Sequence, residues 1–182
     1  MHPTPSPLGP PLTKHRAAVR EYIAQASKLD SGVWLHPIAP GKWSPAQITQ
    51  HVTLGIEMFT DDLAGGTGMA LRLSPWRRFV LRTFMLPRLL RKGQYPGGTK
   101  APREIRPSDT PATQPEALGK LQEAVTALEA TVASVPNAAS RRLSHAYFGR
   151  VPAATAIDLL ALHARHHMAQ LPHAAPRAAR NA

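Results

Sequence analysis

Four stretches of the sequence place apolar residues at the three- and four-residue spacing of one helix face, and none alternates convincingly as a strand does. They cover about residues 13–29, 45–64, 113–135 and 152–171. Helices of this length, each with a single apolar face, bury that face by packing against one another. The sequence therefore predicts an all-α protein built as a four-helix bundle.

Two of the four predicted helices carry clear start signals. The second begins at Ser44-Pro45-Ala46-Gln47 and the third at Thr113-Gln114-Pro115-Glu116. Each sequence has the pattern of a capping box, in which a hydroxyl residue and a residue three positions later satisfy each other's free backbone groups. The glycines from Gly65 onward indicate the end of the second helix.

A long connection, about residues 64–112, joins the second and third helices, and this length allows the two helices to run parallel. It contains a basic segment, residues 72–106, with ten Lys and Arg against one acid, whereas the net charge of the whole chain is +11. Residues 74–92 predict an additional helix that Pro87 breaks. We expect the connection to cover the bundle or to form a homodimer interface. The alternative is a binding module whose basic segment docks on an anionic membrane or on nucleic acid.

The composition narrows the possible chemistry. The chain has 182 residues and no cysteine, which excludes disulfide scaffolds, thiolate zinc sites, iron–sulfur clusters and a cysteine nucleophile. Any metal must therefore be held by histidine and carboxylate. Residues 1–12 are predicted to be a flexible proline-rich leader and residues 172–182 a flexible tail, and residues 13–171 form the domain. Because no segment resembles a signal peptide or a membrane span, we expect a cytoplasmic protein.

The fourth predicted helix concentrates the histidines. At 100° per residue His163 and His167 lie on one face within the apolar arc, and His166 lies at its edge. Buried imidazoles need partners, and a pair at i and i+4 can direct two ring nitrogens at one metal ion. Hydrogen-bonded histidines are the alternative. In the second helix His51 flanks the apolar stripe, where it can face a neighbouring helix as a third ligand or bond a backbone carbonyl.

These residues also resemble a known family. The segments 42–48 leading to His51, 145–149 and 163–171 are similar to the DinB-like superfamily, in this order and over about residues 13–171. The resemblance implies a four-helix bundle in which His51, His163 and His167 bind a divalent metal ion. It also implies that His166 is a neighbouring histidine that does not bind the metal.

Three further residues are candidates for orienting a ligand or contacting a substrate. Gln170 lies on the ligand face of the fourth helix, where it could hydrogen-bond a ligand or bound water. His145 lies in a segment where members of the family commonly have His-Pro-Tyr-Phe-Gly, although Ala146 here replaces the proline. Asp62 is the best-placed carboxylate of the second helix, with a solvated residue of its last turn as the alternative.

The resemblance implies a metal-dependent enzyme that acts on a small molecule. Members of the superfamily include transferases that activate a low-molecular-weight thiol and maleylpyruvate isomerases. A thiol cosubstrate is compatible with a chain that lacks cysteine, and so are a metal-dependent hydrolase and a metal protein without activity. The donor set fits zinc, nickel, manganese or iron.

Overall fold

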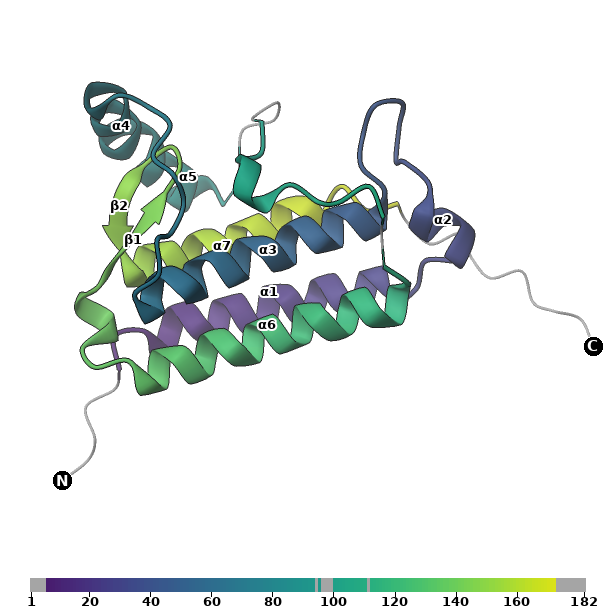
Figure 1. Cartoon of the computed structure of the whole chain (residues 1–182), viewed down its shortest axis with the longest axis horizontal. Helices are drawn as coiled ribbons and strands as arrows, with labels where there is room; N and C mark the ends of the chain where they lie inside the picture. Colours follow the sequence, from purple (N-terminus) through teal and green to yellow (C-terminus); the bar gives the residue numbers. More distant parts are fainter. Residues whose placement is uncertain (1–5, 94, 96–99, 111, 173–182) are drawn as a thin grey trace, which may run out of the picture.

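The computed structural model describes residues 6–93, 95, 100–110 and 112–172. Four long helices form its body: α1 (Gly9–Ala26), α3 (Pro45–Ala64), α6 (Gln114–Ser134) and α7 (Ala153–Met168). Figure 1 shows α3 beside α7 and α1 beside α6, with α3 and α6 running in the same direction. The predicted all-α bundle and the parallel arrangement of these two helices are therefore confirmed.

The apolar faces of the four helices meet in one core. Its fully buried members include Tyr22, Ile56, Leu121 and Ile157, one from each long helix. Tyr22 also hydrogen-bonds the Thr49 hydroxyl at 2.8 Å, which joins α1 to α3 inside the core. The spacing of apolar residues in the sequence thus identifies the faces that pack together.

The local signals set the ends of α3. The Ser44 hydroxyl accepts the Gln47 N–H at 3.3 Å, and the Gln47 side chain accepts the Ser44 N–H at 3.1 Å. Gly65 ends the helix at φ 108°, a left-handed conformation that suits glycine. At the start of α6, Glu116 accepts both the backbone N–H and the hydroxyl of Thr113, at 3.1 and 2.7 Å.

The limits of α1 and α7 differ from those predicted. Helix α1 starts at Gly9, inside the expected leader, because Pro10 and Pro11 lie in the first turn, where a helix makes no use of the missing N–H groups. It ends at Ala26, and α7 ends at Met168, so Gln170 lies in the turn that follows α7. Residues 1–5 of the leader and 173–182 of the tail lie outside the described residues.

A two-stranded hairpin, β1 (Arg142–His145) and β2 (Gly149–Pro152), was not predicted. The strands are antiparallel, with Leu143 paired with Val151 and His145 with Gly149. Each strand has only four residues, too few for an alternating pattern to emerge from the sequence. The buried side chains of Leu143 and Val151 attach the hairpin to the core.

The long connection folds into short helices. Helix α4 (Pro75–Val80), the π-helical turn η1 (Leu81–Met85) and α5 (Leu86–Lys92) follow one another without a break. The prediction that Pro87 breaks this helix is therefore wrong. In the wide turn the Leu86 N–H bonds the Leu81 carbonyl, and such a turn accommodates a proline inside a helical segment. Farther on, the short helix η2 (Arg103–Ile105) lies against α3.

Two small elements complete the described fold. The short helix α2 (Ser31–Leu35) buries Trp34, whose indole N–H donates to the Ala112 carbonyl at 3.0 Å. The 3-10 turn η3 (Ala138–Ser140) precedes the hairpin. No helix among the described residues has both the length and the apolar character needed to cross a membrane.

Candidate metal centre

Three histidines from two helices meet at one point inside the bundle. His51 comes from α3, and His163 and His167 come from successive turns of α7. The Nε2 atom of His163 lies 2.9 Å from that of His51 and 3.1 Å from that of His167. In the described part of the chain these three residues could hold a metal ion.

The outer nitrogens of His51 and His167 have partners that define their tautomers. The Nδ1 atom of His51 lies 2.6 Å from the Ile105 carbonyl oxygen. A carbonyl only accepts, so this Nδ1 carries the proton and the Nε2 atom of neutral His51 is a lone pair. The Nδ1 atom of His167 lies 2.9 Å from Oε1 of Gln170, which has the same effect. Both residues thus present an unprotonated nitrogen to the centre.

The convergence of these nitrogens fits a cation. With Nε2 of His51 and His167 unprotonated, His163 can supply one N–H, which satisfies only one of the two lone pairs. A bound cation accepts a nitrogen lone pair from each of the three histidines. Two imidazole nitrogens that each lie about 2.0–2.1 Å from one ion are about 3 Å apart when they bind at roughly right angles. The observed separations agree with that value.

Burial keeps the three imidazoles neutral. It lowers the pKa of His163 well below its ordinary value, and the neighbouring histidines lower it further. Burial likewise lowers the pKa of His167 to about 3 and also lowers that of His51, despite the hydrogen bond to Ile105. Neutral imidazole is the form that binds metal, so the ligand set is ready at neutral pH.

Two contributors to this centre were not predicted. A bond from His51 to a backbone carbonyl was one of the alternatives, but the carbonyl is that of Ile105 in η2, 54 residues away, and no local signal connects the two. Gly55 lies one turn after His51 on α3, and a Cβ atom there would approach Nδ1 and Cε1 of His163 to 3.4 Å. A glycine inside a long helix is a signal of close packing, and it could have been noticed.

Comparison with known proteins identifies the family and the fold. The family model of the DinB superfamily matches residues 12–171. The chain belongs to the DinB superfamily. Its structure is also similar to that of a mycothiol-dependent maleylpyruvate isomerase, with a TM-score of 0.57 and 15% sequence identity. The match covers 93% of this chain and 62% of the isomerase chain, and at this identity it establishes the fold. No curated protein matches the sequence.

In this DinB superfamily member a cavity of about 1260 Å³ opens beside the three histidines. Its walls are mainly apolar and aromatic, with Trp43 and Phe59 from the α3 region and Met85 and Leu89 from the connection. Its charged lining residues are Lys42, Lys100 and Arg106, and no Asp or Glu is among the described lining residues. The cavity therefore suits a small molecule that combines an apolar part with negative charge.

The remaining candidate histidines lie near the centre without joining it. The His166 Nε2 atom bonds Nε2 of Gln170 at 3.0 Å, so Gln170 connects His166 with His167. His145 lines the same cavity. Its Nδ1 atom accepts the N–H groups of Tyr147 and Phe148 at 3.2 and 3.4 Å, which closes the turn of the hairpin.

Asp62 lies elsewhere. It is buried near the end of α3, not solvated, and its Oδ2 atom accepts the Ser144 N–H at 2.5 Å. It is not among the residues that line the cavity. The contact joins α3 to the hairpin, so the structure gives Asp62 a position that supports the fold and does not bring it to the metal centre.

Proposed function

We propose that the chain binds a divalent metal ion through His51, His163 and His167 and uses it in a reaction with a low-molecular-weight thiol. The observation that carries the proposal is the convergence of three neutral Nε2 atoms, 2.9 and 3.1 Å apart, at the wall of a large cavity. The similarity of the fold to a mycothiol-dependent isomerase supports the choice of a thiol as cosubstrate.

An ion held by three neutral ligands supplies a concentrated positive charge that can bind a thiol as thiolate near neutral pH. The side chains of the protein do the rest. The Ile105 carbonyl and Gln170 hold the rings of His51 and His167 in position. Lys42, Lys100 and Arg106 attract the carboxylates of an acidic thiol or of an anionic acceptor.

Tyr95 is a neutral hydrogen-bonding group at this wall. Its ring centre lies 6.0 Å from that of His163, and its hydroxyl donates to the Leu159 carbonyl at 3.4 Å. Burial raises the pKa of Tyr95, so the hydroxyl keeps its proton at neutral pH. It can position a substrate by a hydrogen bond while the apolar walls exclude water.

Metal analysis tests the ligand set. Untagged protein, purified without added metal, should contain about one divalent ion per chain, with imidazole ligands favouring zinc, nickel or iron. Alanine at His51, His163 or His167 should remove most of the metal, because two imidazoles hold an ion far more weakly than three. His166→Ala is the matched control and should retain it. Loss of the metal in His166→Ala alone would show that the ligand set is wrong.

Calorimetry tests the thiol. Titration of metal-loaded protein with mycothiol, bacillithiol and glutathione in buffers of different ionisation enthalpy reports both affinity and proton release. Tight binding with release of about one proton is expected for the metal-loaded form only. Lys100→Ala with Arg106→Ala should weaken the binding of acidic thiols. Equal binding to the loaded and metal-free forms would contradict the thiol reaction and leave the metal site in place.

A further inference from the structure

The segment α4–η1–α5 exposes large aromatic side chains at one end of the molecule. Trp76 and Phe84 are each 70% exposed and Phe79 is 48% exposed. The Trp76 and Phe79 rings stack on each other, with centres 5.8 Å apart. Figure 1 shows α4 projecting beyond the bundle at the end that carries the hairpin. The expectation that the connection covers the bundle holds for Leu86 and Leu89, which are buried, and not for these three residues.

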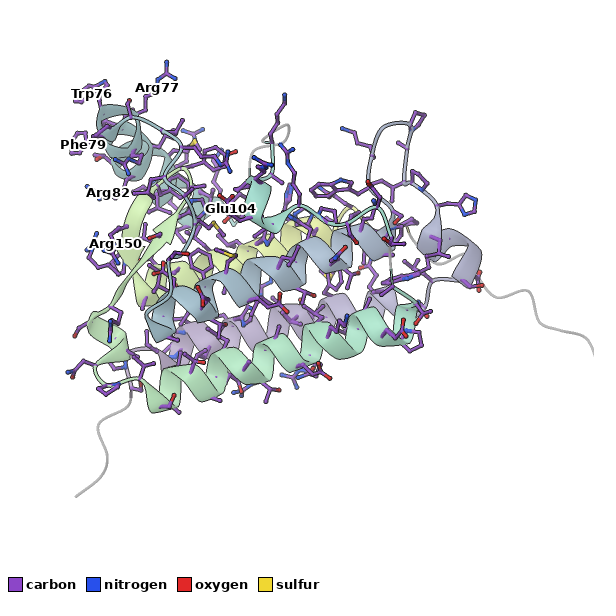
Figure 2. All side chains as sticks on the ribbon, viewed as in Figure 1. Trp76, Arg77, Phe79, Arg82, Glu104 and Arg150 are labelled. Atoms are coloured by element: carbon purple, nitrogen blue, oxygen red, sulfur yellow. The ribbon has the colours of Figure 1, made fainter. Side chains whose placement is uncertain are left out.

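The same end of the molecule carries positive charge that no acidic side chain among the described residues pairs with. Figure 2 shows Arg77 and Arg82 beside Trp76 and Phe79, with Arg150 of β2 just below them. The sequence has no acidic residue between Asp62 and Glu104. Glu104 is occupied by Arg72, whose Nη2 lies 3.0 Å from one carboxylate oxygen and 3.1 Å from the other. Aromatic and basic side chains therefore share one surface without local neutralisation.

The hairpin supports this surface from below. A Cβ atom at Gly149 would lie 3.5 Å from Cδ of Arg78, so the stem of Arg78 rests on the turn of the hairpin. Gly149 has φ +71°, a conformation that side chains rarely adopt. Glycine thus suits the turn of the hairpin that α4 contacts.

We propose that this surface, formed by Trp76, Arg77, Phe79, Arg82, Phe84 and Arg150 and here called the aromatic–arginine end, docks on an anionic lipid membrane. Trp and Phe side chains insert at the boundary between headgroups and acyl chains, and Arg side chains bind lipid phosphates. Each Arg near an anionic leaflet adds to the attraction. The chain then lies on the membrane and does not cross it.

Charge and exposed aromatic area favour a membrane over the other occupants of such a surface. A two-fold dimer through this end would bring the arginines of both copies into one interface without an acidic residue of this surface to offset them, which is repulsive. Duplex nucleic acid would engage the arginines but offers no apolar surface for Phe84. An anionic bilayer matches both the charge and the exposed aromatic area.

Vesicle binding tests the proposal. The protein should bind phosphatidylcholine vesicles that contain phosphatidylglycerol, and pure phosphatidylcholine much less, with weaker binding at high salt. Trp76 provides a direct signal, because Trp34 is buried and Trp43 is only partly exposed. Its fluorescence should shift to the blue and be quenched by brominated lipids. Trp76→Phe should remove both changes.

Paired variants separate the contributions. Arg77→Glu with Arg82→Glu should weaken binding at least about tenfold. Arg20→Glu with Lys120→Glu, two exposed positions on α1 and α6, makes the same change in net charge and should have little effect. Trp76→Ser with Phe79→Ser should also weaken binding, measured by co-sedimentation with the vesicles because this variant lacks the Trp76 signal. His51→Ala lacks the proposed metal ligand and should bind vesicles as the unchanged protein does.

Four results would overturn the proposal: equal binding to neutral and anionic vesicles, no binding to either, equal losses in the two charge-reversed pairs, or a dimer that Trp76→Ser with Phe79→Ser dissociates. Binding of duplex DNA that is tighter than binding of anionic vesicles, and lost in Arg77→Glu with Arg82→Glu, would assign the surface to nucleic acid instead. None of these results bears on the proposed metal centre. The metal analysis of His51→Ala and His163→Ala tests that proposal separately.

Discussion

His15 is fully buried on α1, and neither of its ring nitrogens has a hydrogen-bond partner in the part of the chain that the structure describes. Burial lowers the pKa of His15 from 6.5 to about 4, although Glu129 acts in the opposite direction. His15 binds a proton more tightly in the unfolded chain than in the folded one. The stability that depends on neutral His15 is therefore fully present above pH 6.5 and is lost as the pH falls toward 4. Lowering the pH from 7 to 5 should therefore reduce the free energy of unfolding by about 2 kcal/mol through this residue.

The variant His15→Leu tests this. Leucine removes the titrating group and the unpartnered nitrogens, so the variant should lose about 2 kcal/mol less than the unchanged protein between these two pH values. Urea unfolding at pH 7 and pH 5 measures this loss of stability in the variant and in the unchanged protein. The other histidines are the same in both proteins, so their contribution cancels in the comparison. An identical pH dependence would mean that His15 is hydrated or paired in solution.

Gly55 should control the position of His163. A methyl group at this position meets the His163 ring at 3.4 Å, an ordinary contact, so Gly55→Ala should keep the metal and gain up to about 1 kcal/mol from helix propensity. Gly55→Val places more atoms against the ring and should lower metal affinity at least about tenfold. Gly119→Val on α6, where a Cβ meets no atom within 4 Å, is the control. Full metal affinity in Gly55→Val would mean that Gly55 does not control the position of His163.

At the scale of the elements, Asp62 joins α3 to the hairpin. Asp62→Ala leaves the buried Ser144 N–H without its acceptor and should lower the free energy of unfolding by about 2–3 kcal/mol, with a smaller loss for Asp62→Asn. Glu57→Ala, at an exposed position of the same helix, should change stability little. Thermal or urea unfolding measures the loss. Metal content should stay the same in all three variants, and its loss in Asp62→Ala would indicate a role at the metal centre.

Elements with local signals were predictable from the sequence. Ser44 and Gly65 mark the ends of α3 because capping and the left-handed conformation are properties of a few neighbouring residues. The hairpin was not predictable, since its strands are short and depend on burial of Leu143 and Val151 against the helices. The predicted break at Pro87 is wrong because a π-helical turn, which no sequence rule indicates, accommodates the proline.

For the whole molecule, the sequence predicts the bundle and most of the candidate centre. The spacing of His163 and His167 places both on the buried face of α7, and the family resemblance adds His51 from α3. The contact between η2 and His51 could not be predicted, because it depends on how a connection of nearly fifty residues folds back over α3. The position of the aromatic–arginine end depends on the same tertiary arrangement.

A metal ion at the candidate centre would join α3 to α7, and this leads to a prediction for the whole fold. A ligand that binds only the folded chain stabilises it by about 2.7 kcal/mol at a free concentration one hundred times its Kd. For a domain of this size the Tm should rise by about 5–10 °C. Thermal unfolding of metal-free protein, with and without added zinc or nickel, measures the shift, and a chelator should reverse it.

His163→Ala should show little shift, because the remaining ligands come one from each helix and bind the ion weakly. His166→Ala should keep the shift. An equal shift in His163→Ala would mean that the ion stabilises the chain from another site.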